Sequence, residues 1–119
     1  MKIHNLRNLF FKESNAQIQP QLLKKVLSLT KELSIQNNSK LYFVYLPKYQ
    51  RYKSENNDKE YDLVKNITND LKISFIDIHE EVFERERDPL KLFSFGLNFH
   101  YTKDGYKKIS KSIYRYIKK

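Results

Sequence analysis

Apolar residues recur at helical spacing in three segments of the chain, and each segment begins with a residue that favours a helix start. The first begins at Pro20, the second at Asn57, which has capping-box spacing to Glu60, and the third near Thr102, a good N-cap residue. The predicted buried stripes are Leu22, Leu23, Val26, Leu27, Leu29 and Leu33; Tyr61, Val64, Ile67 and Leu71; and Tyr106, Ile109, Ile113, Tyr116 and Ile117. The sequence therefore predicts amphipathic helices at residues 20–36, at 57–71 and from 102 onward.

Two short runs are apolar at nearly every position, which is typical of strands buried on both faces of a parallel sheet. These runs are residues 41–46, stopped by Pro47, and residues 73–78. Because the second helix separates them, we expect a right-handed β-α-β unit whose two strands are parallel neighbours. The polar residues 48–57 are predicted to form a loop.

The region between the second strand and the last helix is less regular. Residues 80–88 are charged and predict a short solvated helix that ends before Pro89, whereas residues 90–99 are apolar without a period. The predicted fold class is α/β, as one domain over residues 1–119 that forms part of a three-layer flavodoxin-like fold with a small parallel sheet. Two strands are too few for such a domain. We therefore expect residues 3–11, a second chain or the rest of a larger fold to complete it, and we expect the isolated chain to self-associate.

Composition narrows the class of protein. The 119 residues are 39% hydrophobic and include 8 Phe and 9 Tyr, which supports one modest core and excludes a disordered chain. No apolar run approaches the ~18 residues of a membrane span, and the first twelve residues do not resemble a signal peptide. The absence of cysteine excludes disulfides, thiol catalysis and cysteine-ligated zinc, but does not fix the cellular compartment.

The formal charge of +9 raises nucleic acid or an anionic surface as a partner. Lys, Asn, Ile, Tyr and Phe all have A/T-rich codons, however, so a low-GC genome gives the same composition. Arg, the better reader of phosphate and guanine, is scarce. One basic and aromatic segment is a candidate for stacking on bases, with core and loop packing as the alternative. It contains Tyr42, Tyr45, Lys48, Tyr49, Arg51, Tyr52 and Lys53.

His100 is the main candidate for chemistry, because it lies two residues before Thr102 in the loop that enters the last helix. In α/β folds, loops that follow parallel strands carry sites at the carboxyl edge of the sheet. The nearby helix N-terminus favours a neutral imidazole, which is a competent base, although a single His is often structural. Asp77 ends the second strand and is a candidate acid partner or helix cap. Asp77 and His79 lack a third ligand, so neither a metal site nor a cofactor is predicted.

The run His100-Tyr101-Thr102-x-x-Gly105-Tyr106-x-x-Ile109 resembles the last block of SGNH (GDSL-like) hydrolases, in which a His precedes Gly-Tyr and an amphipathic C-terminal helix. The preceding Phe93-x-Phe95-Gly96-x-Asn98 resembles the approach to that His in bacterial cell-surface members. Residues 41–47 and Phe75-Ile76-Asp77-Ile78 resemble the family's late core strands. The resemblance covers roughly residues 20–119.

The resemblance implies a Ser-His-Asp triad for ester hydrolysis or acyl transfer, with His100 as the base. The family's serine lies in an N-terminal Gly-Asp-Ser block, which this sequence lacks. Its triad Asp usually lies two or three residues before the His, where this chain has Asn98 and Leu97. Asn98 is therefore the candidate for orienting the imidazole. Ser94, the nearest serine, lacks the surroundings of a nucleophile elbow.

The chain is thus expected to be the C-terminal half of an SGNH-type enzyme, inactive alone and acting on an ester once the missing N-terminal half supplies a serine. Two other functions stay open. One is a small basic module that binds nucleic acid through the lysine face of the last helix, and it predicts steep salt dependence of binding. The other is a non-catalytic remnant or assembly element.

Overall fold

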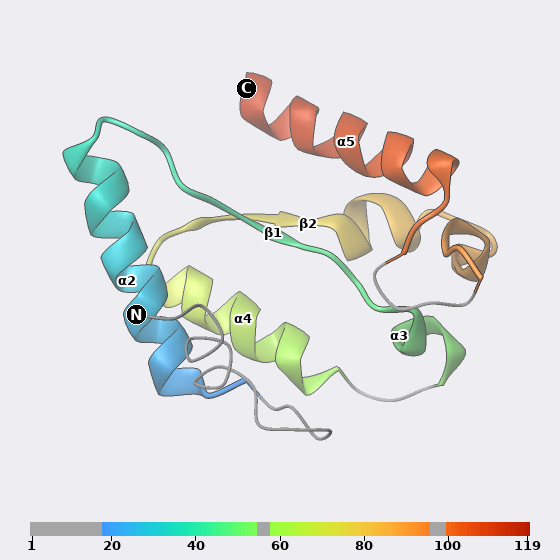
Figure 1. Cartoon of the computed structure of the whole chain (residues 1–119), viewed down its shortest axis with the longest axis horizontal. Coiled ribbons are helices and arrows are strands. Elements are labelled where there is room, and N and C mark those ends of the chain that lie inside the picture. Colours follow the sequence, from blue (N-terminus) through green and yellow to red (C-terminus); the bar gives the residue numbers. More distant parts are fainter. Residues whose placement is uncertain (1–17, 55–57, 96–99) are drawn as a thin grey trace. The chain divides into compact units, whose positions relative to one another are not determined.

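A computed structural model describes residues 18–54, 58–95 and 100–119 of the chain (Figure 1). The elements in chain order are α2 (Pro20–Gln36), β1 (Tyr42–Tyr45), α3 (Tyr49–Lys53), α4 (Lys59–Asp70), β2 (Ser74–Asp77), the π-helix η1 (His79–Phe83), the 3₁₀-helix η2 (Pro89–Leu92) and α5 (Lys103–Lys118). The chain is therefore of mixed α/β class, as predicted. Residues 3–11, expected to add to the sheet, and the predicted cap Asn57 lie outside the described residues.

The chain divides into two compact units. One comprises Met1–Leu41 and Lys59–Ser74, and the other comprises Tyr42–Asp58 and Phe75–Lys119. The first unit contains α2 and α4, whereas the second contains the sheet and the remaining helices. The chain accordingly leaves the second unit after Asp58, beyond α3, and returns to it at Phe75, in β2.

In the first unit, α2 and α4 pack side by side (Figure 1). The face of α4 that carries Tyr61, Val64 and Ile67 is buried, which confirms these three members of its predicted stripe, whereas Leu71 follows the helix and is half-buried. The Lys31 ammonium donates hydrogen bonds to the carbonyls of Leu71 and Lys72, just beyond the end of α4. A cation at this position satisfies carbonyls that the helix leaves unpaired and opposes the negative end of its dipole.

The predicted burial of the α2 stripe is wrong, because no residue of α2 is buried. Leu29 and Leu33 leave half or more of their surface in solvent. Among the described residues, α4 is the only other helix of this unit. A single neighbouring helix covers part of so wide a stripe, and its flanks stay exposed.

In the second unit, β1 and β2 are neighbouring parallel strands, which confirms their predicted pairing. The rings of Phe43 and Phe75 stack across the pair with centroids 5.7 Å apart. The expected burial of β1 on both faces is wrong, because all four of its residues are half-buried. Each strand has one neighbour in the described part of the chain, so both strands are edges and stay partly exposed.

Residues 49–53 form helix α3, where the sequence predicted a loop. Tyr49 meets Phe93 edge-on at 5.5 Å, and Tyr52 stacks on Phe83 at 5.2 Å. Because two rings three residues apart reach the same aromatic core, the backbone between them turns as a helix. The polar residues on the other side of this turn made residues 48–57 look like a loop in the sequence.

The core of the second unit surrounds Phe83, the last residue of η1, which is fully buried. The core consists of Ile76, Ile78, Val82, Phe83, Leu92, Phe93, Tyr101 and Ile109. The helix predicted at 80–88 is confined to η1, because Val82 and Phe83 turn inward and the exposed charged residues that follow leave the helix. None of the described helices is both long and apolar enough to cross a membrane.

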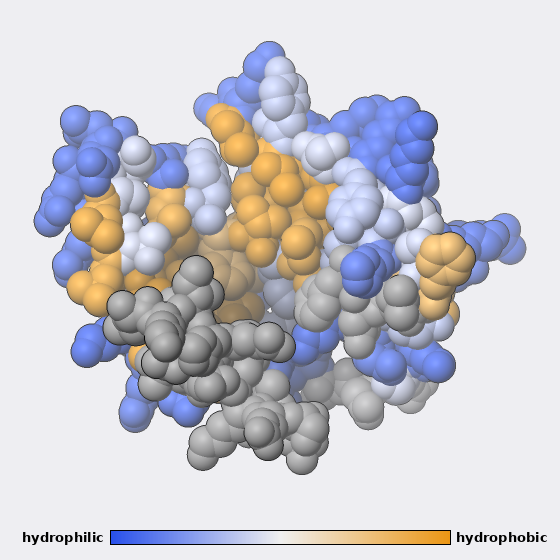
Figure 2. Space-filling view, in the orientation of Figure 1, coloured by the Kyte–Doolittle hydropathy of each residue, from blue (hydrophilic) through white to orange (hydrophobic). Residues whose placement is uncertain are grey.

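Helix α5 begins as predicted, with Thr102 as its N-cap. Its predicted buried stripe is partly wrong, because Tyr106 and Ile117 are 52% and 56% exposed. The buried face is instead centred on Gly105, Ile109 and Ser112, so Tyr106 and Ile117 fall at its margin. Figure 2 shows hydrophilic surface at both ends of α5.

Candidate functional site

The His100 side chain is exposed, and its backbone is held immediately before α5. The Ser94 N–H donates to the His100 carbonyl oxygen at 2.6 Å, and Phe93 and Tyr101 form an antiparallel bridge. The two ends of the intervening loop are therefore fixed to each other. Asn98, the predicted partner of the imidazole, lies in this loop and outside the described residues.

Tyr101 fixes the position of its neighbour His100 relative to the sheet. Its hydroxyl donates to the Pro47 carbonyl oxygen at 2.7 Å, and Pro47 follows β1 by two residues. The Tyr101 ring is buried against Phe83 and Phe93, and this burial raises the pKa of its phenol. Tyr101 thus remains a neutral donor, and residue 100 lies near the carboxyl end of β1.

Gly105 and Thr102 form the turn that leads from His100 into α5. The Thr102 N–H donates to the Leu92 carbonyl at 2.8 Å, and its hydroxyl oxygen accepts from the Gly105 N–H at 3.1 Å. A β-carbon at position 105 would lie 2.8 Å from the Leu92 carbonyl oxygen. The structure of this turn therefore explains why Thr102 and Gly105 follow His100 at these positions.

Ser94 is half-buried and opposes His100 through the backbone only. Within residues 18–54, 58–95 and 100–119, no hydrogen bond joins its hydroxyl to the imidazole. This geometry gives no activated serine. The described residues also contain no group of three His, Asp or Glu side chains that could hold a metal ion.

A second histidine, His79, lies at the carboxyl end of β2 in a polar cluster that the sequence interpretation missed. Its Nδ1 lies 2.7 Å from the Tyr52 hydroxyl and its Nε2 lies 3.1 Å from a Glu84 oxygen. In the tautomer protonated at Nε2, Tyr52 donates to the ring and the ring donates to Glu84. The signal was present in the sequence: Tyr52 and His79 each follow a predicted strand by a few residues.

Burial and the positive charge of Arg51 lower the pKa of His79, against the opposing effect of Glu84. Asp77, which was a candidate acid partner or helix cap, accepts a hydrogen bond from the Glu80 N–H at 3.2 Å and so caps η1. Burial also raises the pKa of Tyr52, so this phenol stays protonated. The Tyr52–His79–Glu84 contacts therefore link α3 to η1 through a neutral imidazole.

Several of the side chains considered for base stacking form hydrogen bonds or ring contacts within the second unit. Tyr45 donates to Asp58 at 2.5 Å, and Arg51 contacts the same carboxylate at 3.2 Å and the Tyr45 hydroxyl at 3.3 Å. The Arg51–Asp58 ion pair is largely buried. Together with the core contacts of Tyr49 and Tyr52, these bonds argue against an aromatic platform for nucleic acid.

Searches among models of known protein families, curated proteins and solved structures gave no match to this chain.

The lowered pKa of His79 predicts that the chain loses stability as the pH falls. The unfolded chain has a normal His pKa of about 6.5 and binds the proton more readily than the folded chain below that pH. The free energy of unfolding should therefore drop as the pH falls below about 6.5, and less steeply in His79→Gln. Urea unfolding at several pH values tests this, with His100→Gln as the control. An equal pH dependence in His79→Gln and the parent chain would contradict it.

Proposed function

We propose that this chain supplies the histidine-bearing part of an SGNH-type ester hydrolase or acyltransferase, with His100 as general base. The observation that carries the proposal is an exposed imidazole, anchored through Tyr101, near the carboxyl end of β1. Ligands of open α/β sheets bind at this edge. The parallel strand pair and the Thr102-capped α5 support the finer assignment to a three-layer flavodoxin-like fold.

The reaction requires a serine from a segment that carries the family's Gly-Asp-Ser block. His100 accepts the proton of that serine hydroxyl while the oxygen attacks the acyl carbon of an ester. The imidazolium then gives the proton to the departing alcohol, and water or a second alcohol repeats the sequence in the opposite direction. Asn98 is the proposed orienting residue, and no metal or cofactor takes part.

The chain alone should hydrolyse an activated acyl ester no faster than buffer does, because it has neither the serine block nor its oxyanion hole. His100→Ala should leave this background rate unchanged. A spectrophotometric assay with 4-nitrophenyl acetate measures both rates. Robust turnover that His100→Ala abolishes would contradict the proposed division of the triad and would point to a nucleophile within this chain, with Ser94 the first to be replaced.

The DNA that flanks the coding sequence provides a further test. An adjacent frame that encodes a strand followed by Gly-Asp-Ser would supply the required nucleophile. If no such segment is encoded nearby and no serine-bearing partner copurifies with the chain, the proposal fails.

A further inference from the structure

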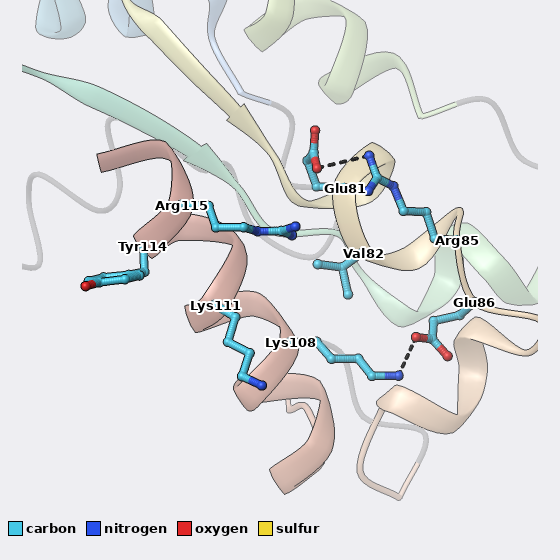
Figure 3. Close-up of a pocket in the computed structure, with 8 residues that line it drawn as sticks. All are labelled: Glu81, Val82, Arg85, Glu86, Lys108, Lys111, Tyr114 and Arg115. Carbon is cyan, nitrogen blue, oxygen red and sulfur yellow. Dashed lines mark hydrogen bonds and ion pairs between the residues drawn. The ribbon is translucent and has the colours of Figure 1, made fainter. Parts of the chain in front are cut away.

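A groove lies between two parts of the second unit (Figure 3). One side is formed by η1 and the turn that follows it, and the other side is formed by α5. All of its lining residues belong to the second unit. Val82, which is buried, lines it from η1, and Lys108, Lys111 and Arg115 line it from α5, with Lys108 and Arg115 turned toward η1 (Figure 3). Its volume of about 460 Å³ is within the range of small-molecule sites. We call it the η1–α5 groove.

The two acidic residues of the η1–α5 groove already have partners. One Glu81 oxygen accepts from the Tyr116 hydroxyl at 3.2 Å, and the other pairs with Arg85 at 3.1 Å. Glu86 pairs with Lys108 (Figure 3). Each carboxylate in the groove thus has one cation beside it, and Lys108 also pairs with Asp104 at 3.3 Å.

Lys111 and Arg115 are the remaining cations of the groove. Both are exposed, and neither forms an ion pair with any acid of the described residues. They are one helical turn apart on α5, which places their β-carbons roughly 5–6 Å from each other. Figure 3 shows Arg115 turned toward η1 and Lys111 lying along α5, and together they leave the groove with an excess of positive charge that flexible side chains can bring to one ligand.

We propose that the η1–α5 groove binds the phosphate group of a small organic phosphomonoester. A phosphate dianion offers three terminal oxygens, which match the planar fork of Arg115 and the three donors of Lys111. The volume exceeds what one phosphate needs, and Val82 offers an apolar contact to the organic part. This inference is independent of the proposed ester chemistry, because it involves neither His100 nor the missing serine.

A small dianion fits this groove better than a nucleic acid strand does. Glu81 and Glu86 line the groove opposite Lys111 and Arg115, so an extended polyanion would pass close to two carboxylates, whose cation partners are already engaged. A single phosphate group makes contact at the unpaired cations alone.

The probe is phenyl phosphate, titrated into the full chain and followed by calorimetry and by amide chemical shifts. We expect saturable one-to-one binding that weakens at least about tenfold in the double variant Lys111→Gln/Arg115→Gln, because both charge-assisted contacts are lost. The matched control is Lys103→Gln/Lys107→Gln, which removes the same charge from exposed α5 positions outside the groove. It should change the affinity less than about twofold.

Three outcomes would overturn the proposal. Equal weakening in both double variants would reveal diffuse attraction to a basic helix. A single-stranded oligonucleotide that binds more tightly than phenyl phosphate would assign the surface to nucleic acid. If binding did not saturate at millimolar phenyl phosphate, the groove would contain no specific phosphate site. Inorganic phosphate as a second ligand shows whether the organic part contributes, and binding by the organic ester in preference to the free ion supports the proposal.

Discussion

Replacing Phe83 with Ala should lower the free energy of unfolding of the second unit by about 3–5 kcal/mol. Phe83 is fully buried, and its ring lies 5.2 Å from those of Tyr52 and Phe93 and 5.7 Å from that of Tyr101. The Ala variant loses the transfer free energy of the ring and leaves a cavity that rigid aromatic neighbours fill poorly. Urea unfolding monitored by near-UV circular dichroism measures the loss.

Phe95→Ala provides the matched control, because it removes the same side chain from a position that is 94% exposed. Its effect should stay within about 0.5 kcal/mol. If Phe83→Ala cost less than about 1 kcal/mol, the aromatic cluster around Phe83 would not be the core of this unit, and Tyr101 would lose its proposed role in holding residue 100.

Gly105→Ala should also destabilise the chain, although Ala is normally the better helix residue. The usual gain from Gly to Ala in a helix is about 0.5–1 kcal/mol. Here the new β-carbon would lie 2.8 Å from the Leu92 carbonyl oxygen and 3.1 Å from the Tyr101 β-carbon. That carbonyl already accepts the Thr102 N–H, so it cannot move without loss of the hydrogen bond that holds the N-cap of α5 in place. Overpacking of this kind costs about 1–3 kcal/mol, which outweighs the helix gain.

The net expectation for Gly105→Ala is a loss of roughly 1–2 kcal/mol in the free energy of unfolding. Ser110→Ala, at an exposed position in the same helix, should be neutral or slightly stabilising. Thermal or urea unfolding of both variants tests the comparison. A Gly105→Ala variant at least as stable as the parent would mean that the turn from Leu92 to Thr102 relaxes freely.

Local sequence signals predicted the elements that depend on local chemistry. The N-cap of α5 followed from Thr102, and the pairing of β1 and β2 followed from two apolar runs on either side of an amphipathic helix. Helix α3 could not be recognised, because its turn is imposed by Tyr49 and Tyr52 packing against distant residues of the chain.

Burial was predicted less well than secondary structure, because helical spacing identifies a stripe without showing how much of it a neighbour covers. Leu33 on α2 and Ile117 on α5 belong to such stripes and stay more than half exposed. The same distinction between local signals and long-range contacts applies to the candidate site. The loop position of His100 was evident from its distance to Thr102, whereas the contact of His79 with Tyr52 joins two segments that lie 27 residues apart in sequence.

The most direct test of the proposed function is ester hydrolysis by the chain reconstituted with the serine-bearing segment encoded beside it. We expect turnover that requires both parts and falls by at least about 10³-fold in kcat/KM in His100→Ala, because removal of a triad base leaves only the oxyanion hole and substrate binding. Lys103→Ala, an exposed neighbour of the same loop and helix, should retain the parent rate. Turnover that survives His100→Ala, or an assembled pair that hydrolyses no ester, would contradict the assignment of His100 as the general base.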